Sequence, residues 1–140
     1  MNPAFRCIKP SRLPVVRTLQ TAISMRACAD TYANRIQHEP EGRAAGLTTP
    51  QLLEVRFTPP FFNSSKTTLT PELVAARLFA DYSTLAVRVP DAVFKGLKAF
   101  LNDTQLVEAT STVGFYNFVS RFLLALNVDG KMDLPVPIPT

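Results

Sequence analysis

The segment Gln105–Val128, QLVEATSTVGFYNFVSRFLLALNV, decides the fold class of this chain. Its spacing predicts one long helix, and the second half of that helix is apolar on nearly every side. Five side chains between Val113 and Val128 carry charge or a strong hydrogen-bonding group: Tyr116, Asn117, Ser120, Arg121 and Asn127. A helix of this kind is expected inside a domain or inside an oligomer. Arg121 cannot lose its charge, so we expect it to meet an ion partner, a solvated cavity or a ligand.

A half-polar stripe runs along one face of the same helix. Thr112, Tyr116 and Ser120 follow one another at intervals of four residues, so they share a face, which is either a pocket wall or a helix–helix contact. Tyr116 and Asn117 are about 100° apart around the axis, so at most one of them points squarely into a shared pocket. Glu108 lies some four turns from Arg121 along the axis and cannot pair with it. A structural role is expected for Glu108.

Five further helical patterns precede this segment, and no pair of alternating strands is found. Pro14, Thr49-Pro50 and Thr70-Pro71 mark helix starts, and Gly46 marks a helix end. The sequence therefore predicts an all-α fold of about six helices. The expected earlier helices span residues 13–27, 29–45, 49–57, 70–86 and 90–101.

The segments between and after the helices complete the domain organisation. In the loop 57–69, we expect Phe57, Phe61 and Phe62 to anchor the chain to the core, with Asn63-Ser64-Ser65 facing water. Prolines alternate with apolar residues near the C-terminus, which predicts an extended tail suited to lie along a neighbouring subunit. The expected organisation is an arm or leader at 1–12, a helical domain at 13–128 and a tail at 129–140.

The charge of the chain is unevenly distributed. The net charge is +4, but residues 1–29 hold five basic and no acidic residues, and the remainder holds ten basic against eleven acidic residues. The body of the protein therefore has no nucleic-acid footprint. No apolar run approaches the roughly 18 residues of a membrane span. We expect a cytoplasmic protein; the alternative is that the basic, acid-free N-terminus is a mitochondrial targeting segment.

Cysteine and histidine are too few for a metal or disulfide framework. Cys7 and Cys28 lie 21 positions apart, and His38 is the one histidine. This spacing matches neither a zinc site nor a Cys-x-x-Cys motif. The sequence predicts a protein without metal or cofactor.

Several motifs of the chain resemble the carboxymuconolactone decarboxylase-like family, which shares its fold with the alkylhydroperoxidase AhpD-type proteins. The resemblance covers roughly residues 13–128 and implies an AhpD-like helical bundle. The motif of the last helix, from Glu108 through Gly114-Phe115-Tyr116-Asn117 to Arg121-Phe122, is the most specific part. The other motifs are Leu13-Pro14, His38-Glu39-Pro40, Ala44-Ala45-Gly46-Leu47, Thr70-Pro71-Glu72-Leu73, Phe79-Ala80-Asp81-Tyr82, Val89-Pro90-Asp91-Ala92-Val93-Phe94 and Gln105-Leu106-Val107-Glu108-Ala109-Thr110.

The resemblance favours the decarboxylase branch of that family over the peroxidase branch. Anchored on His38, the two peroxidase cysteines fall on Thr31 and Asn34, and the peroxidase glutamate falls on Leu19. Thiol peroxidase chemistry needs a reactive thiolate and a resolving partner. Cys28 alone is left for a thiol-dependent antioxidant, which is the least favoured alternative.

The decarboxylase branch acts without a cofactor on small cyclic or aromatic acids. By resemblance, His38 is the acid/base catalyst and Arg121 binds an anionic oxygen of the substrate. Tyr116 and Asn117 donate to an enolate, and Asn34 occupies the substrate-side position where the family usually has a glutamate. The other hypothesis is a non-catalytic oligomeric scaffold related to the family. Both imply a homo-oligomer, either a trimer or a hexamer built as a dimer of trimers.

Overall fold

The computed structural model describes residues 14–27, 32–130, 133–135 and 138–140, with only the backbone described at 14–17, 32–37 and 129. The described residues form six α-helices and no strand, which confirms the all-α prediction. A π-helical turn, η2 (Tyr82–Ala86), extends the fourth helix, and a 3-10 turn, η3 (Val128–Gly130), follows the last. The helices are α1 (Pro14–Ala27), α2 (Tyr32–Ala44), α3 (Thr49–Phe57), α4 (Pro71–Asp81), α5 (Asp91–Lys98) and α6 (Asp103–Ala125). The expected arm at 1–12 and both cysteines lie outside the described residues.

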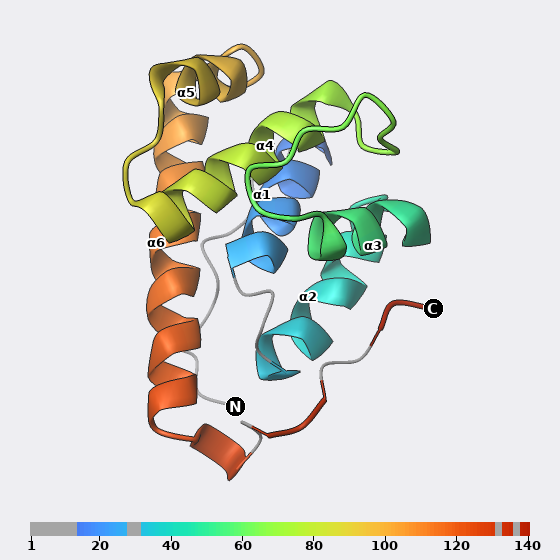
Figure 1. Cartoon of the computed structure of the whole chain (residues 1–140), viewed down its shortest axis with the longest axis vertical. Coiled ribbons are helices and arrows are strands. Elements are labelled where there is room, and N and C mark those ends of the chain that lie inside the picture. Colours follow the sequence, from blue (N-terminus) through green and yellow to red (C-terminus); the bar gives the residue numbers. More distant parts are fainter. Residues whose placement is uncertain (1–13, 28–31, 131–132, 136–137) are drawn as a thin grey trace.

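Helix α1 is the centre of the core. It contacts α2, α3, α4 and α6, and its Leu19, Ala22 and Ile23 are almost completely buried. Figure 1 shows α4 crossing α1, with α6 as a long rod on one side and α2 and α3 on the other. Burial of this apolar stripe against four helices is the main stabilising interaction of the fold.

The helix starts and stops follow the local sequence closely. Thr70 caps α4 as predicted, while α3 is capped by Thr48 rather than Thr49, with Gln51 completing a capping box. Gly46 adopts a φ of 95°, and the amides of Gly46 and Leu47 donate to the carbonyls of Arg43 and Gly42. This pair of hydrogen bonds is a Schellman motif, which confirms the predicted glycine stop.

Helix α4 does not run as a regular α-helix to Ala86. The π turn at Tyr82–Ala86 changes the direction in which later side chains point. Leu85 continues the apolar spacing of the helix predicted at 70–86, yet it is exposed. The prediction was wrong at this position because a period of 3.6 residues does not continue through a π turn.

The loop 57–69 is held mainly by polar groups. Phe57 and Phe62 are exposed, which contradicts the expected apolar anchor at these two positions, whereas the partly exposed Phe61 packs against the ring of Tyr82 with centroids 4.5 Å apart. The carboxylate of Glu54 instead accepts hydrogen bonds from the amide and hydroxyl of Thr68, at 2.7 and 2.6 Å, and from the Thr67 hydroxyl. The loop can leave the rings of Phe57 and Phe62 largely exposed because its backbone is already fixed by these hydrogen bonds.

Three buried charged residues join α1, α3 and α4, and we name them the Arg26–Arg77–Asp81 cluster. Asp81 accepts from Arg26 with one carboxylate oxygen and from Arg77 with the other, the latter at 3.1 Å. Arg26 also donates to the carbonyl oxygens of Val55, Arg56 and Thr58 at the end of α3, so the cluster ties that helix end to α4.

Helix α6 is buried on one face only. Its inner residues Leu106, Ala109 and Val113 lie in the core, whereas Phe118 and Phe122 are exposed. The expectation that the whole helix is enclosed is therefore wrong for a single chain. Two opposite faces of one helix are apolar, and the fold covers one of them.

The C-terminal tail returns to its own chain. The guanidinium of Arg43 donates to the backbone oxygen of Thr140 at 2.7 Å, and the hydroxyl of Thr49 lies 3.4 Å from the same oxygen. The end of the tail thus lies against α2 and the start of α3, where the sequence suggested a neighbouring subunit.

Candidate active site around His38

His38 and Tyr116, two of the predicted site residues, are in direct contact. His38 lies on α2 and is 8% exposed. Its ring meets the ring of Tyr116, on α6, edge to face, with centroids 4.6 Å apart and planes at 85°. Such aromatic pairs are stabilising and fix ring orientation. The structure therefore brings together two predicted site residues that are separated by 78 positions in the sequence.

The surroundings of His38 favour the uncharged form of its imidazole. Burial lowers its pKa, and the nearby carboxylate of Glu41 opposes this effect in part. Its Nε2 is buried and makes no hydrogen bond within the described part of the chain. A buried polar atom without a partner is uncommon and costs free energy, so it identifies either a strained core position or a functional group.

The stripe Thr112, Tyr116 and Ser120 is buried along its whole length. Thr112 and Ser120 donate to the carbonyls of Glu108 and Asn117 in their own helix, at 2.7 and 3.3 Å. These two positions serve helix packing, because their hydroxyls are occupied within α6. Tyr116 is the residue of this stripe whose ring contacts His38.

Asn117 and Arg121 lie away from His38. Arg121 follows Tyr116 by five residues, so the two side chains point about 140° apart around α6. The Arg121 guanidinium is exposed and donates to the Asn117 side-chain oxygen at 2.6 Å and to its carbonyl at 3.0 Å. Asn117 in turn donates to the Thr84 hydroxyl at 3.1 Å. Within one chain these two residues join α6 to η2 and do not face the imidazole.

The two other predicted residues are placed differently. Glu108 accepts a hydrogen bond from the Gln20 side chain at 3.1 Å, a contact between α6 and α1 of the kind expected for a structural residue. Asn34 belongs to α2, but its side chain is outside the described residues.

The Arg26–Arg77–Asp81 cluster was not found from the sequence. Burial lowers the pKa of the Arg77 guanidinium, Asp81 raises it, and Arg26 lowers it again. The spacing of four residues between Arg77 and Asp81 is a visible signal for an ion pair. No local signal links Arg26 to either residue, since 55 positions separate it from Asp81. The saturation of Arg26 by backbone carbonyls marks this cluster as a structural element.

The described residues contain no group of three or more side chains that could bind a metal ion. None of their helices is long and apolar enough to cross a membrane. Comparison of the chain with models of protein families, with curated proteins and with solved structures found no match.

Proposed function

We propose that this chain is a cofactor-independent enzyme that moves a proton in, or decarboxylates, a small cyclic or aromatic acid. One observation supports it above the others: the imidazole of His38 is buried against the ring of Tyr116, and its Nε2 has no partner among the described residues. Burial also lowers the pKa of this imidazole, which favours its uncharged form. A general base needs its uncharged form at working pH and a fixed direction for its lone pair. The resemblance to carboxymuconolactone decarboxylases points to the same residue.

The chemistry proposed for His38 is a transfer of one proton. For a proton shift, the imidazole takes the proton from the carbon next to a carbonyl, and the electron pair enters the enolate. The imidazolium then returns that proton to another carbon of the conjugated system. For decarboxylation, the imidazole first takes the proton of the carboxylic acid. The bond to the resulting carboxylate then breaks, carbon dioxide leaves and the bonding pair enters the enolate. The imidazolium returns the proton to the enolate carbon.

Tyr116 and Asn34 are the predicted substrate-side residues that this proposal keeps. Tyr116 orients the imidazole and lines the site, as its contact with His38 supports. Arg121 and Asn117 point away from the imidazole and hydrogen-bond to each other, so the proposal gives them no contact with a substrate at His38. The proposal places the protein in the cytoplasm, with the mitochondrial alternative resting on its basic N-terminal segment.

Deuterium exchange into cyclic β-keto acids and vinylogous acids, followed by proton NMR in D₂O, tests the proposal. Release of carbon dioxide is measured in parallel. The wild-type chain should exceed the buffer rate, and His38→Gln should lose roughly 10²- to 10⁴-fold. Glu39→Gln, which changes an exposed ion pair on the same helix, serves as the matched control and should leave the rate unchanged. Equal rates for wild type and His38→Gln would refute the role of His38.

A second candidate is the non-catalytic oligomeric scaffold. The closed surroundings of His38 and the exposed outer side of α6 favour it. In this case His38→Phe should keep or raise the unfolding temperature, since an apolar ring of larger size replaces an unpaired polar one. Cyclic keto acids should then leave the unfolding temperature of the wild type unchanged, whereas an enzyme should be stabilised by a bound acid.

A further inference from the structure

We infer that α6 pairs with α6 of a second copy of this chain, antiparallel and centred on Phe118. The contact is independent of the chemistry proposed at His38. It uses the outer face of α6, which we define by the exposed residues Val107, Ser111, Gly114, Phe115, Phe118, Arg121, Phe122, Ala125 and Leu126.

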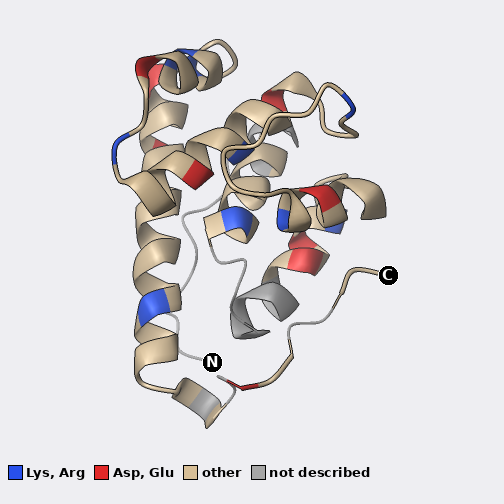
Figure 2. Cartoon of the chain, viewed as in Figure 1, with Lys and Arg blue, Asp and Glu red and all other residues tan. Residues whose placement is uncertain are grey.

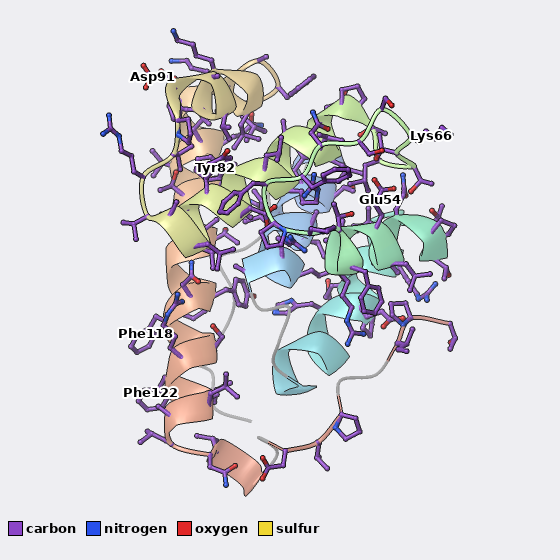
Figure 3. All side chains as sticks on the ribbon, viewed as in Figure 1. Glu54, Lys66, Tyr82, Asp91, Phe118 and Phe122 are labelled. Carbon is purple, nitrogen blue, oxygen red and sulfur yellow. The ribbon has the colours of Figure 1, made fainter. Side chains whose placement is uncertain are left out.

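The outer face is apolar over most of the helix. Phe115, Phe118 and Phe122 are 42%, 63% and 49% exposed. In Figure 3 the rings of Phe118 and Phe122 point away from the other helices, and Figure 2 shows a single basic segment on an otherwise uncharged second half of α6. That segment is Arg121. Contiguous exposed apolar area of this kind marks an interaction site.

The area suits a pair of identical chains. The exposed fractions of the three phenylalanines add up to about one and a half phenylalanine side chains, which is an exposed area on the order of 300 Å². Val107 and Leu126, also strongly exposed, extend this toward 500 Å² per copy, so two copies bury roughly the 1,000 Å² that a specific interface needs.

The spacing on the outer face is that of a helix–helix seam. Ser111, Phe115, Phe118, Phe122 and Ala125 follow one another at intervals of 4, 3, 4 and 3 residues. This alternation places all five within one narrow stripe, as in coiled coils. The stripe carries no charge, so a second apolar helix meets no unpaired ion along it.

The outer face is also complementary to itself. Phe115 and Phe122 lie on one flank of Phe118, and Gly114 and Arg121 lie on the other. A two-fold axis at Phe118 places the same flank of both helices side by side, with the helices running in opposite directions. A residue before Phe118 in one copy therefore meets a residue after Phe118 in the other copy. Phe115 then faces the partner's Phe122, and Arg121 faces the partner's Gly114.

Gly114 supports this arrangement. A Cβ built on Gly114 would meet nothing within 4 Å, so no packing inside the chain requires glycine there. Between two helices, the missing side chain leaves room for the long side chain of Arg121 from the second copy. The arrangement keeps both guanidinium groups at the rim, where they stay hydrated.

Sedimentation velocity of the full chain over a range of concentrations tests the proposal. The wild type should dimerise, and Phe118→Glu should weaken the dimer at least 100-fold, because it places two carboxylates at the centre of the contact. Phe57→Glu changes an equally exposed phenylalanine on α3 and should leave the dimer intact. Circular dichroism should show unchanged unfolding of Phe118→Glu. A monomeric wild type, as expected if the face receives a different protein, would overturn the proposal.

Cross-linking tests the direction of the helices, in a background where Cys7 and Cys28 are replaced by serine. With a short bis-maleimide, a mixture of Phe115→Cys and Phe122→Cys chains should give mixed dimers. Either variant alone should give few. Efficient cross-linking of Phe115→Cys with itself would show parallel pairing and would also overturn the proposal.

Discussion

Replacing Asp81 by asparagine should remove a large part of the stability of this protein. The change keeps the shape of the side chain but removes the one negative charge of the Arg26–Arg77–Asp81 cluster. Asp81 is 2% exposed, and its two oxygens accept from both guanidinium groups and from the amide of Phe61 at 3.2 Å. Asparagine presents its amide NH2 to one of these donors. The two guanidinium groups then face each other with no carboxylate between them, and the Glu54 carboxylate is left as the acidic group that acts on Arg77.

The expected loss is about 3–5 kcal/mol, the cost of removing one partner from a buried ion pair. With a urea dependence of about 2 kcal/mol per molar for a chain of this size, the unfolding midpoint should fall by roughly 2 M. Urea titration followed by circular dichroism measures it. Glu39→Gln, which breaks the exposed pair with Arg43, is the control and should cost less than about 0.5 kcal/mol.

Arg77→Met gives a second test of the same reasoning. It removes one cation and leaves Arg26 and Asp81 as a neutral pair, so its loss should be clearly smaller than that of Asp81→Asn. A loss below about 1 kcal/mol for Asp81→Asn, or a greater loss for Arg77→Met, would show that charge balance in the cluster does not control stability.

Three further predictions concern single groups, each followed by urea titration. The pKa of His38 is lowered in the folded chain, so, as the pH falls, the unfolded chain binds the proton of this imidazole before the folded chain does. The free energy of unfolding should therefore decrease below about pH 6.5 by up to ~1.4 kcal/mol per pH unit, and His38→Gln should remove this dependence. Gly46→Ala should cost about 1 kcal/mol because of the positive φ at that position, whereas Gly96→Ala, inside α5 with open space around it, should stabilise by up to about 1 kcal/mol. For Glu54, burial raises the pKa, but hydrogen bonds from Thr67 and Thr68 outweigh it and lower the pKa overall; Glu54→Gln should therefore cost about 1 kcal/mol at pH 7, and less as the pH falls through the lowered pKa. A wild-type pH profile identical to that of His38→Gln, equal effects of the two glycine changes, or a pH-independent cost at Glu54 would contradict these expectations.

The local signals in the sequence predicted the helices well. Thr70-Pro71 and Gly46 act over a few residues, so their effect can be read without knowledge of the rest of the chain. The sequence did not predict the contact of His38 with Tyr116, since no spacing rule relates two residues on different helices; a resemblance between motifs gave both only as site residues.

The errors have a common physical origin. Periodicity shows that a residue is apolar on a given face, but it does not show which face the fold covers. Phe118 on α6 is exposed for this reason. The pairing of Arg26 with Asp81 depends on tertiary geometry. The outward direction of Leu85 depends on a π turn, which no pattern in the sequence predicted.

The central position of α1 has a consequence for synthesis on the ribosome. Helix α1 emerges before α6, and the contacts between the two helices join residues such as Gln20 and Glu108, which are 88 positions apart. At about 5–20 residues per second, translation delivers that partner roughly 4–18 s later. During this interval α1 has no α6 to pack against, so the nascent chain exposes apolar surface that chaperones bind until α6 has left the exit tunnel.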